Sequence, residues 1–529
     1  MNQQLHIRTV GETGILVELD SLAHVMGLQT LLRQQNLPGV IGIVAAAETI
    51  LISCNSPSAV RGVREFLAAT DTQIQTPIPG TVHRLKTTYD GADLTDAARL
   101  SGLSSEALVA WHSGQQWLAA FGGFAPGFMY LAAAEHSLLV ARLSTPRTVV
   151  PAGSVAVGGE FSAVYPGPTP GGWQLLGRCA DILWDAGREQ PALIEPGDAV
   201  EFMPVRELIE VGVAKPTVVT PRSHGPSGLQ VLAAGVHTTV QDLGRQGYAH
   251  LGVPESGALD RAALRRANRM VGNGNLGAAG LEVVLSGLSF RAVGAHIVAV
   301  AGTSAVPFIA DLHGDEREAP ANAPFLLLDG ETLTLRPLTL LPATRLKSTA
   351  GFRSYLAVRG GLDLPPVLGS RSTDVLSGLG PDPIAAGVFL PVAPAPAGSI
   401  VGAPEAALSP PLEVTNLKYL PGPRDDWFTP QSLAHFEAQI WEVGAQSNRI
   451  GLRLTGTPLQ RSASAAGAEL PSEGMANGAI QVPPSGLPML FLADHPVTGG
   501  YPVLGVVLGE DLDKAAQLAP GARVRFSAI

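Results

Sequence analysis

The chain has 529 residues, of which 46% are hydrophobic and 15% are charged, and its formal net charge is −10. A single hydrophobic core rarely serves so long a chain, so we expect several domains, and the apolar content excludes a disordered protein. The acidic balance argues against nucleic acid, whose phosphates attract basic surfaces. The 61 glycines and 43 prolines divide the apolar runs into short segments, which predicts a mainly β fold.

The cysteines and the apolar runs exclude further classes of protein. Cys54 and Cys179 cannot form a disulfide framework, and neither has a Cys or His at the spacing of a zinc site. We therefore expect no metal, and we interpret Cys179 as a small buried residue. No run reaches the roughly 18 uncharged apolar residues of a membrane span, and the first residues lack a signal-peptide pattern. These observations predict a cytoplasmic protein that does not contact a membrane.

Residues 1–80 have the pattern of a small mixed α/β domain. The order of its predicted elements is similar to a ferredoxin-like sandwich, and a Pro- and Gly-containing segment at 77–80 marks its end. The predicted elements are strands at 6–10 and 15–18, a helix over 22–33, a hairpin at 40–46 and 49–53, and a helix over 58–69.

The rest of the chain divides into two large halves. The region 81–210, predicted as one β-barrel domain, contains two short helices over 95–100 and 105–111, and from 119 to about 205 it is strand-like and rich in Gly-containing turns. The segment 211–227 contains Pro216, Pro221 and Pro226, which predicts a linker. The second half is expected to hold a β-rich domain over 228–405, with one clear helix over 258–271, and a last β module over 406–529.

Three sequence blocks occur twice, in the same order. The blocks 153–157, 171–173 and 196–202 match 478–482, 499–501 and 520–526, and the central block changes from Gly-Gly-Trp to Gly-Gly-Tyr. Such self-similarity indicates one β-rich module that is used twice. If the two halves pack with rough two-fold symmetry, the Gly-Gly loops should line related sides of the cleft between them, near Arg147 and Arg371.

The densest motif lies in the first module, at 121–131, and is followed by Thr-Pro-Arg at 145–147. Glycines let a backbone approach a ligand closely and expose N–H groups, which suits an oxyanion or a phosphate. Arg147 offers a planar fork for a carboxylate or a phosphate. Tight β-turns with aromatic core residues explain the same pattern, and spacing alone favours that structural interpretation by about two to one.

Other polar residues have both a structural and a functional interpretation. His112 could act as a general base, although a histidine at a helix end is more often a C-terminal cap. Asp260 falls in the first turn of a predicted helix, where the helix dipole stabilises a carboxylate without any catalytic role. Arg371 lies in a Gly-bounded loop and could contact an anion, while Glu282 is a charged residue in apolar surroundings. The sequence has no phosphate-binding P-loop, no Gly-x-Ser-x-Gly elbow and no Met-Lys-Met biotin-attachment motif.

Together these motifs resemble a known family. The segments 123–131, 145–147, 150–154 and 169–178 are similar to the allophanate hydrolase subunit 1 (KipI-like) domain. The resemblance covers most of the chain, in the order of a fused subunit 1–subunit 2 protein. The segments similar to the subunit 2 (KipA-like) domain are 239–248, 252–260, 369–373, 447–449, 478–483 and 494–501.

The resemblance implies a fold and an activity. The implied fold is mainly β with α/β additions, in which cyclophilin-like β-barrels are repeated and a small ferredoxin-like domain comes first. Such proteins are the B and C subunits of an ATP-dependent 5-oxoprolinase, working with a separate A subunit, and they are similar to the carboxyltransferase part of urea carboxylase. The implied activity is therefore hydrolysis of 5-oxoproline to glutamate, with ATP and a partner protein like the 5-oxoprolinase A subunit.

Two other functions stay open. One is a biotin-dependent carboxyltransferase that acts on urea or another amide, with the biotin attached to a partner and not to this chain. The other is a non-catalytic regulator of a sensor histidine kinase, a role described for some relatives. The many loops rich in Gly, Arg and Asp favour a small-molecule site over a pure interaction surface. A homo-oligomer is also open.

The resemblance and the loop motifs assign candidate site residues. Opening an unactivated lactam needs groups that stabilise developing negative charge, which arginines and backbone N–H groups can do. The candidate catalytic residues are Arg147, Ser154, Arg178, Asp260, Arg371 and Asp494. The candidate substrate-binding residues are Phe124, Gly127, Tyr130, Gly153, Gly171, Gly172, Trp173, Gln241, Asp242, Ser256, Ser372, Thr373, Asn448, Arg449, Gln481, Thr498, Gly499, Gly500 and Tyr501.

Overall fold

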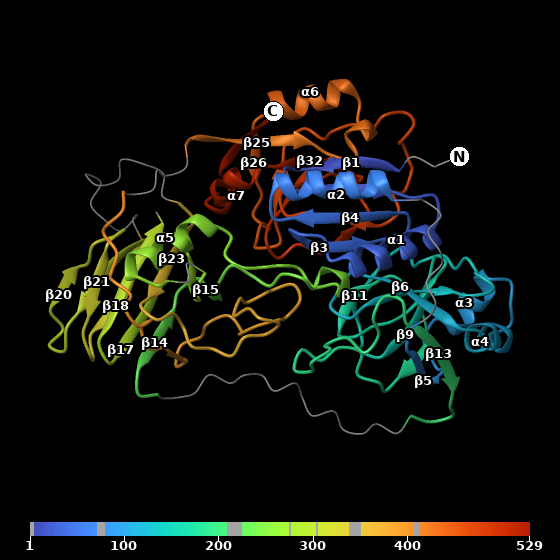
Figure 1. Ribbon diagram of the computed structural model, residues 1–529, viewed down its shortest axis with the longest axis horizontal. Coiled ribbons are helices and arrows are strands. Elements are labelled where there is room, and N and C mark those ends of the chain that lie inside the picture. Colours follow the sequence, from blue (N-terminus) through green and yellow to red (C-terminus); the bar gives the residue numbers. More distant parts are fainter. Residues whose placement is uncertain are drawn as a thin grey trace.

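The computed structural model describes residues 5–70, 80–208, 225–274, 277–302, 305–337, 351–406 and 412–529. These residues form an N-terminal α/β domain, a first β-barrel, a β-sandwich and a second β-barrel. Figure 1 shows the N-terminal domain beside the second barrel, with the sandwich at the opposite end of the molecule from the first barrel. Most of the predicted boundary at 77–80 and most of the predicted linker at 211–227 lie outside the described residues.

The N-terminal domain has the expected elements around a four-stranded antiparallel sheet in the order β1-β2-β4-β3. Strands β2 and β3 both run antiparallel to β4 between them, and α1 connects them, which makes a split β-α-β unit. The ferredoxin-like expectation is confirmed, except that the edge strand that usually comes last is here β1, the first in the chain. The elements are β1 (His6–Val10), β2 (Gly14–Glu18), α1 (Leu22–Gln35), β3 (Val40–Ala45), β4 (Thr49–Cys54) and α2 (Pro57–Ala69).

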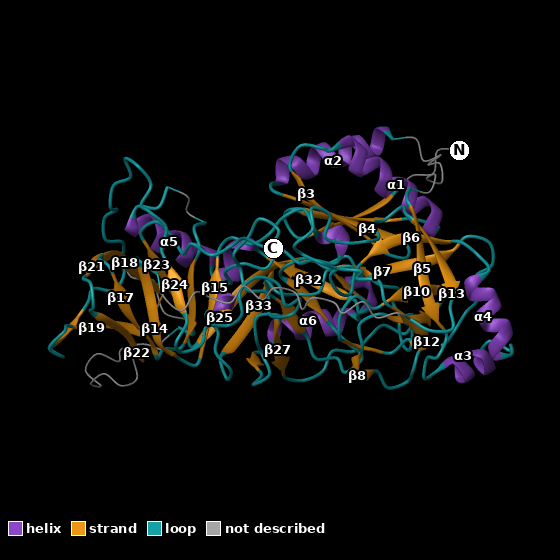
Figure 2. Ribbon diagram, turned by 90° about the horizontal axis from the view of Figure 1, so that it is seen from below, coloured by secondary structure: helices purple, strands orange, loops and turns teal. Residues whose placement is uncertain are grey.

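Both faces of this sheet are buried, because successive strand residues point to opposite sides. Ile15 and Val17 pack in one hydrophobic cluster with residues of α1 and α2, including Val25. Leu16, between them in sequence, packs instead with Phe491 and other residues of the second barrel. The sheet therefore lies between its own helices and the second barrel, and Figure 2 shows the two helices on its outer side.

The first barrel is closed by seven strands in the order β10-β7-β6-β13-β5-β12-β9. All neighbouring strands are antiparallel except β5 and β13. Strands β8 and β11 form a separate two-stranded sheet. The elements are β5 (Val82–Thr88), α3 (Leu94–Leu100), α4 (Ser105–Ser113), β6 (Trp117–Gly122), β7 (Met129–Ala133), β8 (Arg147–Val150), β9 (Ser154–Gly158), β10 (Phe161–Val164), β11 (Thr169–Gly171), β12 (Gln174–Cys179) and β13 (Ala199–Pro204).

The second barrel is closed by seven strands in the order β25-β32-β29-β30-β27-β26-β33. Its one parallel neighbouring pair is β25 and β33. The elements are β25 (Val414–Pro421), α6 (Pro430–Ala438), β26 (Trp441–Val443), β27 (Gly451–Thr455), β28 (Glu473–Gly474), β29 (Ala479–Gln481), β30 (Met489–Phe491), β31 (Thr498–Gly499), β32 (Val503–Val507), α7 (Gly509–Ala516) and β33 (Arg523–Ala528).

The two barrels are copies of one topology, which confirms the repeat. Taken from the parallel pair onward, β5-β13-β6-β7-β10-β9-β12 corresponds strand for strand to β25-β33-β26-β27-β30-β29-β32. Trp117 and Trp441 hold equivalent places, since each donates its indole N–H to a carbonyl oxygen five residues earlier, of His112 at 2.9 Å and Phe436 at 3.0 Å. The rings of His112 and Phe436 each pack against a phenylalanine of the last strand of their barrel, at centroid distances of 4.3 and 4.7 Å.

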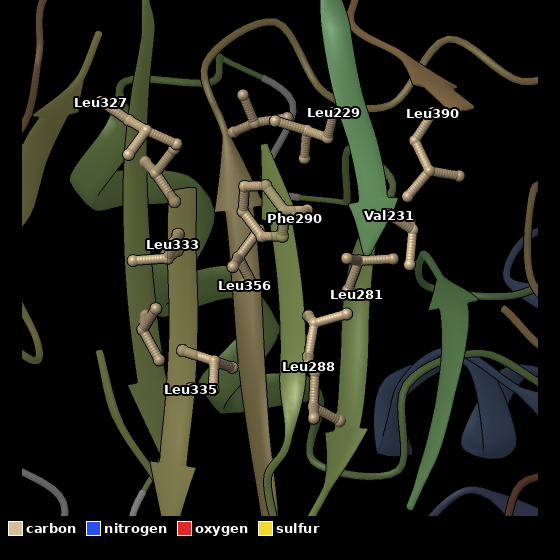
Figure 3. Close-up of a cluster of buried hydrophobic side chains, with 14 of the residues drawn as sticks. Leu229, Val231, Leu281, Leu288, Phe290, Leu327, Leu333, Leu335, Leu356 and Leu390 are labelled. Carbon is tan, nitrogen blue, oxygen red and sulfur yellow. The ribbon is translucent and has the colours of Figure 1, made fainter. Parts of the chain in front are cut away.

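The middle domain is a sandwich of a six-stranded sheet, β20-β19-β22-β17-β14-β24, and a five-stranded sheet, β15-β16-β23-β18-β21. Leu229, Phe290 and Leu356 belong to the hydrophobic cluster between the sheets, which Figure 3 shows. The strands are β14 (Gly228–Ala234), β15 (His237–Gln241), β16 (Gly280–Val284), β17 (Leu288–Val293), β18 (His296–Gly302), β19 (Ala305–Ala310), β20 (Glu316–Glu318), β21 (Pro324–Leu327), β22 (Thr332–Pro337), β23 (Arg353–Val358) and β24 (Phe389–Pro391).

Helix α5 (Arg261–Val271) packs on the other face of the five-stranded sheet, where Leu264 and Met270 contact the cluster around Tyr355. The helix begins later than predicted because the Asp260 carboxylate accepts the backbone N–H of Ala263 at 2.7 Å. Asp260 is thus the N-terminal cap, and its predicted place in the first turn was wrong. None of the helices in the described parts of the chain is long and apolar enough to cross a membrane.

Candidate functional site

Loops of both barrels and of the middle domain meet at the centre of the molecule. The backbone N–H of Phe124 donates to Thr498 Oγ1 of the second barrel at 3.1 Å. A Cβ on Gly123 would come within 2.7 Å of the same oxygen, and one on Gly252 within 2.3 Å of the Ala125 carbonyl oxygen. These close approaches require glycine, so the Gly-rich motif at 121–127 is explained first by the packing of domain on domain.

The two repeated Gly-Gly loops approach the same segment of the first barrel. Trp173, next to Gly171 and Gly172, packs against Phe128 and Tyr130 with ring centroids 5.5 Å apart in both cases. In the second copy, Thr498 contacts Phe124, and Thr498 and Gly499 form β31, which pairs with β28. Arg147 lies opposite Gly171 in the β8–β11 pair. Arg371 is different, because the hydrogen bonds of its side chain and backbone stay in the middle domain.

Arg449 is the centre of a buried ion network that joins the sandwich to the second barrel. Its Nε and Nη2 donate to the two carboxylate oxygens of Asp494 at 3.0 and 2.9 Å. Its Nη1 donates to Glu282 of β16 at 2.5 Å, and Nη2 also donates to the Gly257 carbonyl oxygen at 2.6 Å. Ser256 adds a hydroxyl hydrogen bond to Asp494 at 2.6 Å. The side chain of Asp494 has no exposed surface, so this network is a fully buried interdomain contact.

A second set of hydrogen bonds extends the network to α7. The Tyr355 hydroxyl donates to Glu282 and accepts the backbone N–H of Asp260, both at 2.8 Å. Gln517 donates to the Asp260 carboxylate at 2.7 Å, and its amide oxygen accepts two backbone N–H groups at the start of β23. Asp260, proposed as catalytic, therefore caps a helix and binds the second barrel at the same time.

Burial and neighbouring charges shift the pKa values in this network. Burial favours the neutral carboxyl of Glu282, but the positive charges of Arg449 and Arg353 outweigh it and lower its pKa. Burial likewise disfavours the charge of Arg449, yet Asp494 and Glu282 raise its pKa. Asp260 lacks an arginine partner, so burial raises its pKa to about 6. Glu282 thus stays ionised beside Arg449, whereas Asp260 titrates near neutral pH.

Asp242 organises the Ser-Arg-Ser-Thr loop at 370–373. Its carboxylate accepts the hydroxyls of Ser370 and Ser372 at 2.7 and 2.5 Å and the backbone N–H of Arg371 at 2.6 Å. Gln241, beside it, donates to the Thr373 carbonyl oxygen at 2.9 Å. Five of the predicted site residues therefore do lie together, but their hydrogen bonds run to one another and shape the loop.

Buried polar atoms without partners lie next to this loop. Arg245, which is 2% exposed, donates through Nη2 to the Ser372 carbonyl oxygen, but its Nε and Nη1 have no hydrogen-bond partner. Its Nη1 is 3.8 Å from Asp374 Oδ2, which also lacks one, as does Gln241 Oε1. Burial, and then the charge of Asp494, raise the pKa of Asp374 to about 6. Unpaired buried atoms of this kind mark a place for a ligand or a bound water.

The candidate residues of the first barrel have partners of their own. Arg147 pairs with Asp93 at 2.6 Å, and Arg178 pairs with Asp90 at 2.6 Å with its side chain 56% exposed. The bond from Arg178 lowers the pKa of Asp90. Ser154 is buried within β9. The structure does not bring Ser154 or Arg178 into the central ion network.

Both interpretations of His112 were wrong. Its ring is buried, and it is hydrogen-bonded to the Tyr89 hydroxyl and to Ser162 Oγ at 2.8 Å each. Burial lowers its pKa to about 3, so the ring is neutral and serves the barrel core in the place of Phe436. Cys179 is buried as expected, and burial raises its pKa to about 12.

The remaining candidate residues have mainly structural surroundings. Gly127 and Gly153 have positive φ angles of 76°, which only glycine adopts easily, and Gly500 and Tyr501 follow β31. Asn448 accepts the backbone N–H of Ile450 at 2.9 Å, and Gln481 donates to the Tyr501 carbonyl oxygen at 3.2 Å.

Sequence reasoning missed Arg353, Tyr355, Asp374 and Gln517 as members of the network. Glu282 carried a signal, because it is a charge inside the apolar strand β16. Gln517 had none, since it lies in the last module and its partners are more than 160 residues away in sequence.

Comparisons with known proteins agree with this architecture. Residues 5–194 match the family described as carboxyltransferase domain, subdomain C and D, and residues 251–528 match carboxyltransferase domain, subdomain A and B. The chain belongs to this carboxyltransferase-domain family, with both pairs of subdomains fused in one polypeptide.

The relatives specify the class further. The chain is 34% identical to the 5-oxoprolinase C subunit of Escherichia coli (strain K12) over 56% of its own length and 90% of the relative's. It is 33% identical to the 5-oxoprolinase B subunit of Escherichia coli O157:H7 over 39% of its own length and 98% of the relative's. It is 32% identical to urea amidolyase of Saccharomyces cerevisiae over 57% of its length, which is 16% of that relative.

A solved structure matches the whole arrangement. The crystal structure of TTHA0988 is 32% identical and superposes with a TM-score of 0.84 over 99% of this chain and 100% of that chain. The fused order of the domains and the two barrels are therefore shared with a protein of known structure.

Proposed function

We propose that this chain is the fused B and C component of an ATP-dependent 5-oxoprolinase that works with a separate A-type subunit. The observation that carries the proposal is the tandem match: one half covers 98% of a B subunit, and the other covers 90% of a C subunit. Where two separate subunits are replaced by two halves of one chain, their contact becomes an internal one, here including the hydrogen bond from Phe124 to Thr498 and the packing of Leu16 with Phe491. A cytoplasmic location, where ATP is available, belongs to the same proposal.

The reaction opens a five-membered lactam. Water supplies the oxygen of the new carboxylate, the ring C–N bond breaks, and the nitrogen leaves as the amine of glutamate after taking up a proton. An unactivated lactam resists this attack, so ATP held by the partner would activate the carbonyl oxygen by phosphorylation, with loss of ADP. One water then supplies an oxygen as the C–N bond breaks, and a second water releases the phosphate to leave the free carboxylate. Negative charge develops at the carbonyl oxygen, where buried N–H donors are most effective.

The cavity between the N-terminal domain and the second barrel does not fit a magnesium nucleotide. No three His, Cys, Asp or Glu side chains among the described residues are grouped to hold a metal ion. In the cavity between the N-terminal domain and the second barrel, Arg245 and Arg261 share the wall with Glu12 and Glu255, whose charges would repel a triphosphate. The proposal therefore assigns ATP to the partner, and no step on this chain runs through it.

The role left to this chain is to hold the amide substrate at the junction. The Arg449 network fixes the sandwich against the second barrel, and the Asp242 network fixes the loop that carries Asp374. Between them lie the unpaired N–H groups of Arg245, which can donate to a carbonyl oxygen. Arg147 and Arg178 would need to exchange their aspartate partners to contact substrate.

A carboxyltransferase acting on urea is the second candidate, because the matching family is described as a carboxyltransferase domain and one relative is a urea amidolyase. It would take carboxyl groups from biotin attached to a partner protein. Urea and 5-oxoproline share the amide group, so the same donors at the junction suit both substrates.

The decisive experiment is coexpression with an A-type partner subunit, followed by an assay of glutamate released from 5-oxoproline. ATP-dependent release by the complex, and none by either component alone, is the expected result. A stable complex that releases no glutamate contradicts the proposal. Biotin-dependent carboxylation of urea by the chain and a biotinylated partner would establish the second candidate instead.

A further inference from the structure

A cavity of about 390 Å³ lies where the N-terminal domain, the 245–255 segment and the second barrel meet. Its volume falls in the range of about 300–1,000 Å³ that is typical of small-molecule sites. Its wall includes Gly42 of β3, Arg245 and Arg261 beside the middle domain, and Asn477 and His495 of the second barrel. Three separate units of the fold thus contribute to one enclosed space, as is common for ligand sites between domains.

The wall offers hydrogen-bond acceptors that no part of the described protein uses. His495 is 7% exposed, and its ring contacts the Pro496 carbonyl oxygen through Nδ1 at 2.8 Å. That contact requires the proton on Nδ1, and burial lowers the pKa of the ring, so Nε2 is left as an acceptor without a partner. Asn477 Oδ1 is buried and also lacks a partner.

The wall also offers donors. Arg261 pairs through Nη2 with Glu255 at 3.3 Å, while its Nε has no partner. Arg245 has two fully buried N–H groups without a hydrogen-bond partner, of which Nη1 lies 3.8 Å from Asp374, and its Nη2 connects the wall to the loop at 372–374. Glu12 accepts the backbone N–H of Gly509 at 3.0 Å. The two arginines and the two glutamates balance, so the wall has no net charge to attract a strong anion or cation.

We propose that this cavity binds the amide group of the substrate. A neutral wall with adjacent donors and acceptors complements a carbonyl oxygen next to an N–H group, which is the shared chemistry of a lactam and of urea. The carbonyl oxygen accepts from the partly exposed guanidinium of Arg261, and the amide N–H donates to His495 Nε2. This inference rests on the proposed function, whose substrate it places.

Calorimetry on the full chain, alone and in complex with an A-type partner subunit, tests the site. The probes are 5-oxoproline, 2-pyrrolidinone and urea, with proline as the ring that lacks an amide. We expect one or more of the amides to bind and proline not to bind. No binding by any amide to the chain or to the complex overturns the inference.

Two variants localise the binding. His495→Phe keeps an aromatic ring beside Phe491 but removes the acceptor, and it should weaken amide binding about tenfold, the worth of one hydrogen bond. Gly42→Val leaves every polar group in place and fills the cavity, because a Cβ there meets only Ala249 and Ser53 at 3.8 Å, and both line the same space. It should abolish binding without lowering the melting temperature.

The matched control is His112→Phe, the same substitution at a buried histidine of the first barrel. Unchanged amide affinity in this control, with losses in the two cavity variants, supports the site. Equal affinity in all variants places the amide elsewhere and overturns it. If the cavity variants lose amide binding but the wild-type complex releases no glutamate, the site stands and the proposed function fails. If complexes that contain the two cavity variants release glutamate at the wild-type rate, the proposed function stands and the proposed site fails.

Discussion

The two barrels have the same strand order but differ in what their loops contact. In the first barrel, Arg147 and Arg178 pair with aspartates of the same barrel and remain partly exposed. In the second barrel, Arg449 and Asp494 are completely buried against the sandwich. The repeated part of the structure therefore supplies a frame, and the residues that differ between the copies make the central junction.

The difference also appears in the barrel cores. His112 with its two hydroxyl partners stands where the second copy has Phe436, so one core has a small polar cluster at this place and the other has Phe436 stacked on Phe526. A polar group can be exchanged for an aromatic one at an equivalent place when its hydrogen bonds are satisfied. No hydrogen bond among the described residues links His112 or Phe436 to a charged residue of the central junction. These two positions therefore contribute to the packing of the barrel cores.

The largest contrast between the barrels is expected from arginine deletion. Arg449→Ala leaves Glu282 and Asp494 buried without a cation, which should lower the free energy of unfolding by about 3–5 kcal/mol. Arg178→Ala removes an exposed pair and should cost less than about 1 kcal/mol. Denaturant unfolding of both variants measures the difference. Equal effects would mean that the junction does not hold the two domains together.

The next contrast comes from exchanging the two core residues. Phe436→His puts an imidazole into a core where the hydroxyl of the neighbouring Tyr419 already donates to Glu437, at a cost of about 2–4 kcal/mol. His112→Phe keeps the ring packing but leaves the Tyr89 hydroxyl unpaired and the Ser162 hydroxyl with only its bond to the Ala156 carbonyl oxygen, at a cost of about 1–2 kcal/mol. Melting temperatures of the two variants should fall in that order. The reverse order would contradict the equivalence of the two sites.

The two regions should also respond to pH with opposite signs. The pKa of Asp374 is raised to about 6, so its contribution to stability is full below about pH 4 and is lost as the pH rises through 6. Relative to Asp374→Asn, the wild type should therefore gain about 1–2 kcal/mol of unfolding free energy between pH 7 and pH 4. The pKa of His112 is lowered to about 3, so its contribution is present above about pH 6.5 and is lost toward acid.

Unfolding measured from pH 4 to pH 7 distinguishes these contributions. His112→Phe should flatten the loss of stability toward acid, and Asp374→Asn should remove the gain. The same slope in wild type and both variants would show that neither group titrates in the way that its burial implies.

The smallest expected effect concerns the contact between the barrels. Thr498→Val has the same shape but loses the hydrogen bond from the Phe124 backbone, at a cost of about 1 kcal/mol. Thr334→Val is a control for the substitution itself, because Thr334 is half-buried in the sandwich and its hydroxyl bonds to Ser289 at 3.0 Å, away from any contact between the barrels. Thermal melts of the two variants provide the comparison. An equal change in melting temperature in both would mean that the hydrogen bond at Thr498 does not stabilise the contact between the barrels.

Much of the fold could be predicted from the sequence, because local signals and the repeat both act over short distances. The N-terminal strands are predicted by apolar residues at every second position, and the helices by apolar residues at helical spacing. Ser21 and Ser56 are the N-terminal caps of the two helices. The predicted start of α5 was too early, because the apolar residues of the helical pattern extend upstream of Asp260. The helix begins after Asp260, since the side chain of Asp260 is its N-terminal cap.

The site was predicted only in part, since its contacts join distant segments. Asp242, Ser372 and Thr373 carry loop signatures and do lie together. The pairing of Arg449 with Glu282, 167 residues away, has no local signal, and neither has the burial of His112. Polar residues of an interdomain contact look the same in sequence as exposed or catalytic ones, so only the structure separates them.

The most direct test of the central claim is the rate of ATP-dependent glutamate release from 5-oxoproline by three complexes with an A-type partner subunit. The complexes contain the wild-type chain, Gly42→Val at the junction cavity, or His112→Phe in the first barrel. If the chemistry lies at the junction, the rate should be lost in Gly42→Val and kept in His112→Phe. Loss in His112→Phe with full activity in Gly42→Val would place the reaction in the barrel and contradict the claim.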